Sequence, residues 1–139
     1  MDGRSCFLTT KEGQNVQVMK DSTSLKLYLD DRQDPTRWFI QKKDKQRLTL
    51  CAKNEGRFYV LMADSSELSL KSVPSINPVD LPPDEDCQCE ITNCDKGNFY
   101  ALKFIKPGKF LSTKNSKLGQ EIVLTENEPE YLHITDVEL

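Results

Sequence analysis

Three cysteines lie close together in the segment CQCEITNC, at Cys87, Cys89 and Cys94. Thiolates at short spacing can hold zinc, but this spacing is not that of a zinc knuckle and no histidine is near. In a strand, Cys87 and Cys89 would point to the same face, where cysteines commonly pack as small apolar groups. We therefore predict that this segment binds no metal and no cofactor.

The single histidine, His133, lies in the alternating run YLHITDV. A nucleophilic pair would need a cysteine beside it in space, and nothing in the sequence places one there. Asp84, Glu85 and Asp86 are consecutive, whereas calcium-binding loops use alternating ligands. The sequence also has no phosphate-binding glycine loop and no Gly-x-Ser-x-Gly elbow. These observations predict a protein that is not an enzyme.

The strongest run of positive charge is KFIKPGKFLSTKNSK. Alternation around KFLSTK would place some of its lysines on one exposed face. Such a patch would hold a sulfated glycan or an acidic partner. Ordinary solubilising lysine on a barrel exterior is an equally open interpretation. The lysines concerned are Lys103, Lys106, Lys109, Lys114 and Lys117.

Composition predicts one globular domain spanning residues 1–139. The apolar fraction is 37%, the charged fraction is 29% and the formal net charge is −3, so the chain is not of the disordered class. A net negative charge disfavours nucleic acid as the main partner. No apolar run approaches the roughly twenty residues of a membrane span, so we expect no membrane insertion.

The cysteines and the N-terminal residues bear on the compartment. The five cysteines include Cys6 and Cys51, and an odd number fits reduced thiols better than a disulfide framework. The opening residues MDGRSCFLTTKEG contain no apolar run of signal-peptide length. We therefore expect reduced cysteines and no conventional secretion signal.

Short apolar segments with alternating or burst-like patterns run through the whole chain, and turn-forming residues separate them. No segment has a convincing helical period over ten residues, so the predicted class is all-β. The twelve expected strands are residues 6–10, 14–19, 24–29, 37–41, 47–52, 57–62, 67–73, 87–92, 98–105, 109–113, 120–125 and 131–138.

The sequence also repeats itself. VMKDSTSLKL at residues 18–27 and LMADSSELSL at 61–70 share five positions, and LSTKNSKLGQEIVL at 111–124 keeps their leucine spacing. In this third copy Asn115 and Ser116 are expected at the turn, and Leu118 takes the place of the second leucine. Repetition of a supersecondary unit predicts a β-trefoil, with twelve strands in three four-strand units and pseudo-threefold symmetry. An all-β sandwich is the alternative.

One segment departs from the repeat. PSINPVDLPPDED, residues 74–86, holds four of the seven prolines. Proline has no amide donor for a strand ladder, so this segment is not a central strand. We predict a long, stiff surface loop, with Val79 and Leu81 holding it against the barrel.

Three segments carry a family resemblance. PGKFLST at residues 107–113 resembles the Pro-x-x-aromatic-Leu/Ile-Ser-Thr pattern of the interleukin-1 cytokine family. QEIVLTENEPEYLHITDVEL is similar to the closing strands of that family, and SELSLKSVPSINPVDL resembles its PTLQLESVNI segment. The match is divergent, because Phe99 is two residues too early for the pattern and Glu121 occupies an expected apolar position. The segments cover about the C-terminal half.

The resemblance implies a function. Members are released without a signal peptide after a cytoplasmic stage, and bind a receptor with immunoglobulin-like ectodomains. That receptor then recruits an accessory chain, or fails to do so when the ligand is an antagonist. A soluble, monomeric ligand of inflammation and immunity is therefore expected. Loops would carry the contacts, and the implied receptor-binding residues are Arg37, Lys42, Lys43, Lys45, Glu126, Asn127, Glu128 and Glu130.

Two alternatives stay open. A fibroblast-growth-factor-like trefoil would use the lysine-rich hairpin to bind heparan sulfate and a receptor; the segment LGQEIVL favours it and the acidic composition opposes it. An intracellular trefoil would bind actin or glycans. The single tryptophan, Trp38, does not fit the ricin-type lectin pattern, which has a Gln-x-Trp in every repeat.

Overall fold

The computed structural model describes residues 4–21, 24–30, 35–44, 46–64, 67–82, 85–93, 99–116 and 119–134. In these ranges the regular elements are strands and two short 3-10 turns, η1 (Pro78–Asp80) and η2 (Glu85–Cys87). The predicted all-β class is therefore confirmed. The described residues include no helix of the length and apolarity needed to cross a bilayer.

Thirteen strands form one antiparallel sheet in the described part of the chain. The first predicted strand is divided at Phe7 into two pieces, and each of the other eleven predictions overlaps one observed strand. The strands are β1 (Arg4–Cys6), β2 (Leu8–Thr9), β3 (Asn15–Asp21), β4 (Ser24–Asp30), β5 (Arg37–Lys42), β6 (Arg47–Asn54), β7 (Arg57–Asp64), β8 (Glu67–Val73), β9 (Cys89–Asn93), β10 (Phe99–Phe104), β11 (Lys109–Ser116), β12 (Gly119–Thr125) and β13 (Leu132–Ile134).

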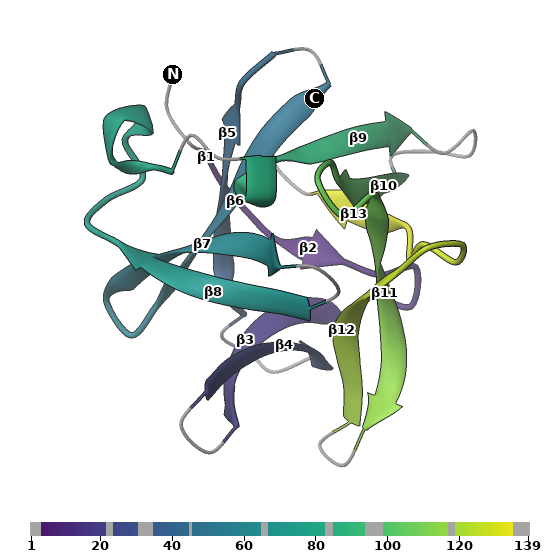
Figure 1. The fold of residues 1–139 in the computed structure, drawn as a ribbon. Helices are drawn as coiled ribbons and strands as arrows, with labels where there is room; N and C mark the ends of the chain where they lie inside the picture. Colours follow the sequence, from purple (N-terminus) through teal and green to yellow (C-terminus); the bar gives the residue numbers. More distant parts are fainter. Residues whose placement is uncertain are drawn as a thin grey trace.

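The sheet closes on itself. Its pairing runs β10–β11–β12–β4–β3–β2–β13, and β13 pairs back to β10 through Tyr100 and Leu132. A branch from β10 continues through β9 and β6 to β5 and β1, and β7 joins β6 to β8 (Figure 1). Closure satisfies backbone groups that an open sheet leaves at its edges.

The main core fills the space inside these strands. Trp38 and Phe104 are its largest fully buried side chains. Trp38 also holds β5 against β3, because its indole N–H donates to the Val16 carbonyl at 3.0 Å. Thr36, the residue immediately before β5, accepts a hydrogen bond from the Val18 amide at 2.9 Å. These polar contacts set where β5 begins.

The proline-rich segment covers a second, smaller apolar cluster. Cys51, Val60, Val73 and Cys87 form it, and Ile76 and Leu81 pack against it from the segment itself. In addition, the Gln41 side-chain amide donates to the Ile76 carbonyl at 2.7 Å. The described residues of the segment thus fold back over the barrel as a surface loop, with Leu81 half-buried against this cluster.

Val79 does not hold that loop, contrary to the sequence prediction. It lies in η1 and is 90% exposed. The turn is closed by polar contacts instead, since the Ser75 hydroxyl donates to Asp80 at 2.6 Å and accepts from the Asn77 amide. A single exposed valine is common on protein surfaces.

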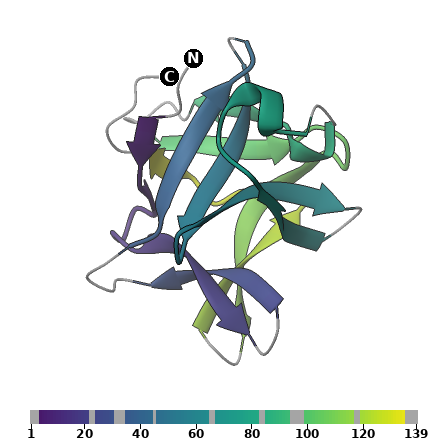
Figure 2. The same cartoon turned by 90° about the vertical axis from the view of Figure 1, so that its left-hand side faces the viewer.

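Three hairpins match the three sequence repeats. In β3–β4 the ladder pairs Val18 with Leu27, and in β7–β8 it pairs Leu61 with Leu70. The third hairpin, β11–β12, pairs Leu111 with Leu124. Figure 2 shows the purple β3–β4 and yellow-green β11–β12 hairpins at the bottom of the view and the teal β7–β8 hairpin at its right.

The turn of the third hairpin is not where the sequence comparison put it. Asn115 pairs with Gln120 and Ser116 with Gly119, so both predicted turn residues are in the ladder. Leu118 lies outside the described residues, and Ile122 takes the position that Leu68 has in β8. The apolar spacing alone misplaced the turn because six residues, Leu111 to Ser116, pair before it in β11, whereas four, Leu61 to Asp64, pair before it in β7.

The turn between β6 and β7 contains backbone strain. Glu55 has φ +52° and Gly56 has φ +78°, and a two-residue hairpin with both residues at positive φ prefers Asn-Gly. For a residue with a β-carbon, this left-handed conformation costs the folded state about 1–2 kcal/mol of free energy. Replacing Glu55→Asn is therefore expected to raise the free energy of unfolding by about 0.5–1 kcal/mol, measured by urea denaturation.

The matched control for this turn is Gly56→Ala. An added β-carbon there would meet no heavy atom within 4 Å beyond its chain neighbours, so the expected loss of about 1 kcal/mol reports backbone strain alone. A loss of stability in Glu55→Asn would contradict the strain argument.

Candidate recognition surface

The connection between β12 and β13, residues 126–131, is tied to β11 by three hydrogen bonds. The Glu130 amide donates to the Leu111 carbonyl at 2.9 Å. The Ser112 hydroxyl donates to the Glu128 carbonyl at 2.5 Å, and the Thr113 hydroxyl lies 3.4 Å from the Glu130 carboxylate. The Ser-Thr pair of the FLST segment therefore positions a charged connection on the barrel exterior.

A mixed aromatic and charged cluster adjoins this connection. The Lys11 ammonium lies 5.8 Å from the Phe99 ring and 5.7 Å from the Tyr131 ring. Partial burial raises the pKa of the Glu130 carboxyl, and the Glu12 carboxylate adds to that shift. The side chains here are only partly covered, so the cluster can contact a partner.

The implied receptor residues of β5 lie at its two ends. Arg37 begins the strand and Lys42 ends it, so the rise of the strand separates their Cα atoms by about 17 Å. Lys43 follows in a tight turn, in which the Asp44 carboxylate accepts hydrogen bonds from the Gln46 and Arg47 amides. These two contacts lower the pKa of Asp44. Lys45 lies outside the described residues.

The other implied contacts are in residues 126–131. Glu126, Asn127 and Glu128 are exposed, and Glu130 is half-buried. Of the seven implied residues that the structure describes, three therefore come from β5 and the turn after it, and four come from residues 126–130.

The lysine-rich run is also divided. Lys103 lies over the Phe110 ring at 5.5 Å, and Lys106 forms an ion pair with Asp86 at 3.0 Å. Lys109 pairs with the buried Phe104, while Lys114 lines a pocket near the other end of β11. Lys117 lies outside the described residues. The four lysines that the structure describes therefore have different surroundings along β10, its following turn and β11.

His133 and four of the five cysteines lie within the described residues. The His133 ring packs 5.7 Å from the Phe99 ring. Cys51, Cys87 and Cys89 are buried thiols, and Cys94 lies outside the described residues. In the described ranges, no three histidine, cysteine, aspartate or glutamate side chains come together as metal ligands.

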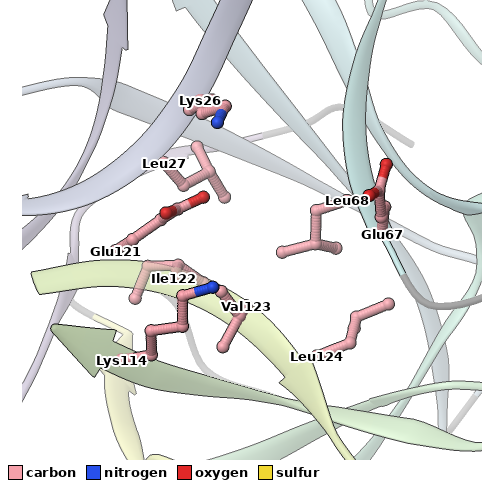
Figure 3. Close-up of a pocket in the computed structure, with 9 residues that line it drawn as sticks. All are labelled: Lys26, Leu27, Glu67, Leu68, Lys114, Glu121, Ile122, Val123 and Leu124. Atoms are coloured by element: carbon pink, nitrogen blue, oxygen red, sulfur yellow. The ribbon is translucent and has the colours of Figure 1, made fainter. Parts of the chain in front are cut away.

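A pocket of about 430 Å³ opens between the three hairpins. Leu27, Leu68 and Leu124 point into it from β4, β8 and β12, as Figure 3 shows. Lys26, Glu67, Lys114 and Glu121 stand around this apolar centre. Side chains of all three repeats therefore share this opening.

Sequence reasoning missed a basic groove formed by two adjoining depressions that share Asn54 and Glu55. Its cations are Lys20, Arg37, Lys53 and Arg57, which come from β3, β5, β6 and β7. Arg37 was named above as an implied receptor contact. The others stand in different segments with no local charge run, so strand register was needed to find them.

No protein-family model matches the chain, and no curated protein matches it. Solved structures do resemble it. The designed threefold-symmetric protein ThreeFoil has a TM-score of 0.66 and 14% identity, over 96% of this chain and 99% of that one. SeviL bound to asialo-GM1 saccharide has a TM-score of 0.66 and 14% identity, over 99% and 100%.

A mosquitocidal holotoxin has a TM-score of 0.73 and 12% identity, over 98% of this chain and 17% of that one. These likenesses, with the closed sheet, define an all-β protein of trefoil-like fold. At such identities they show the fold alone. The resemblance to interleukin-1 cytokines therefore rests on the sequence segments and not on these structures.

Proposed function

We propose that this chain is a divergent interleukin-1-like cytokine that binds an immunoglobulin-type receptor ectodomain, as agonist or antagonist. The observation that carries the proposal is the pair of hydroxyls in the FLST segment. Ser112 and Thr113 contact Glu128 and Glu130, so the residues that resemble the family pattern hold the connection to which the resemblance assigns receptor contact.

The proposal includes the finer architecture. Three four-strand units, twelve strands in all, would be related by a pseudo-threefold axis through the hairpin pocket. Equivalent register in β3–β4 and β7–β8 supports this, as does the sharing of the pocket by β4, β8 and β12. β1 and β2 would together count as the first strand of the first unit.

The proposal also covers cell location and partners. The chain would leave the cytoplasm without a conventional signal peptide, act outside the cell as a monomer, and engage an accessory chain if it is an agonist. Enzymatic activity has no part in it. The support is the resemblance in three segments together with the trefoil-like fold.

The test is direct binding to a panel of interleukin-1-family receptor ectodomains, with and without accessory chains. We expect saturable binding to one receptor. Ser112→Ala should weaken it by roughly threefold to tenfold, because the lost hydrogen bond, worth about 1 kcal/mol, releases the connection. The control Ser72→Ala changes an exposed serine of β8 and should leave affinity unchanged.

A gain in affinity on adding the accessory chain identifies an agonist, and no gain an antagonist. Absence of saturable binding across the whole panel would overturn the proposal. Equal losses of receptor affinity in Ser112→Ala and Ser72→Ala would show that the connection at residues 126–131 is not part of the contact surface.

A further inference from the structure

The basic groove contains two like charges directly opposite each other. Arg37 pairs with Lys53 across the β5–β6 ladder, and like charges in that position destabilise a sheet. In the described residues neither cation forms an ion pair with a carboxylate. A like-charge pair with no ion-pair partner among the described residues is suited to an external anion, although the Glu55 carboxylate lines the same depression.

Aromatic rings hold both cations in place. The Arg37 guanidinium lies 5.1 Å from the centre of the Phe7 ring, and the Lys53 ammonium lies 5.7 Å from that of Phe58. Such contacts attract a cation without neutralising its charge. The two charges therefore stay available at fixed positions on the surface.

The groove continues beyond this pair. One depression of about 620 Å³ is lined by Arg37 and Lys53, and a second of about 610 Å³ by Lys20 and Arg57. Both include Glu55, at the turn where β6 leads into β7 beside β3 (Figure 1). The cations are thus spread along an extended surface and not gathered at one point.

The groove offers side-chain charge to a partner. Its cations stand on four strands, with Arg37 and Lys53 at one depression and Lys20 and Arg57 at the next. Charges spread in this way suit a polymer with regularly repeated anions. Single-stranded nucleic acid also needs aromatic faces on which bases stack, and the Phe7 and Phe58 rings here already lie against Arg37 and Lys53.

We propose that the basic groove binds a linear sulfated polysaccharide. This site differs from the lysine-rich run of β10 and β11. The inference does not rest on the receptor proposal, since a groove of this charge would bind such a polymer whether or not the chain is a cytokine. Binding should weaken as salt screens the exposed charges.

The test compares two triple variants that remove the same charge. The groove variant carries Lys20→Gln, Lys53→Gln and Arg57→Gln, and the control carries Lys103→Gln, Lys109→Gln and Lys114→Gln. Affinity for a heparin oligosaccharide is measured by calorimetry at physiological salt. We expect the groove variant to bind roughly tenfold or more weakly, and the control to change less than about twofold. Thermal unfolding of both variants verifies folding.

Several outcomes would overturn the inference: no heparin binding by the unaltered protein, an equal loss in the control variant, or equal binding of polyglutamate or single-stranded DNA at the same groove. The single variant Lys20→Gln serves if the triple variant does not fold. Arg37 is left unchanged, so receptor binding measured without heparin reports separately on the receptor proposal.

Discussion

Replacing Trp38→Ala is expected to lower the free energy of unfolding by about 3–5 kcal/mol. The side chain is fully buried among the main core residues, and its loss leaves a cavity that the surrounding strands cannot fill. The substitution also removes the donor to the Val16 carbonyl, which is 3.0 Å from the indole nitrogen. A loss of this size is a large fraction of the stability of a small domain.

Urea denaturation followed by circular dichroism measures this effect. Trp38→Phe keeps an aromatic ring but removes the N–H, so it should cost less than alanine. Val79→Ala is the surface control, since Val79 is 90% exposed, and should change stability by no more than about 0.5 kcal/mol. A cost below about 1 kcal/mol for Trp38→Ala would show that β5 is not held as described.

The buried thiols should be almost unreactive in the native protein. Burial raises the pKa of Cys51 to about 12, and the nearby Cys87 adds to the shift. Burial raises the pKa of Cys89 as well. Because the thiolate is the nucleophile, a shift from the ordinary 9.0 to about 12 lowers the thiolate fraction at pH 8 about 1,000-fold.

Iodoacetamide labelling at pH 8, followed by mass spectrometry of peptides, measures this reactivity. The thiol introduced by Ser72→Cys on exposed β8 provides a matched fast reference in the same chain, and the urea-unfolded chain provides the upper limit. Alkylation of Cys51 or Cys89 at the rate of the introduced thiol would contradict the burial argument.

The same pKa shifts predict how stability depends on pH. The folded-state pKa lies above the unfolded value, so above about pH 9 the unfolded chain loses protons that the folded chain keeps. The stabilisation is fully present below pH 9 and is lost as the pH rises toward about 12. Each such thiol contributes a slope of up to about 1.4 kcal/mol per pH unit. Denaturation midpoints at increasing pH measure it.

Much of the fold could be predicted from the sequence because its information is local. Alternation of apolar residues specifies a strand and its buried face, so the repeats at 18–27 and 61–70 indicated two hairpins with the correct partners. The third hairpin shows the limit, since leucine spacing does not determine how many residues pair before the turn. Asn115 and Ser116 were therefore misplaced.

The proline-rich segment shows a different limit. Proline content excluded a central strand, but it could not indicate which apolar residue faces the barrel. The polar closure between Ser75 and Asp80 turns Val79 outward, while Leu81 packs beside Cys51 and Cys87. That choice depends on a surface formed by residues distant in the sequence.

By itself the sequence determined the all-β class, nearly every strand and the segments that resemble interleukin-1 cytokines. Tertiary structure alone decided which side chains share a surface. Ser112 meets Glu128 across 16 positions, and Arg37 faces Lys53 only through the register of β5 with β6. The physical reason is that alternation of side chains along a strand depends only on residues that are neighbours in the sequence. The pairing and register of strands depend instead on how the whole sheet closes.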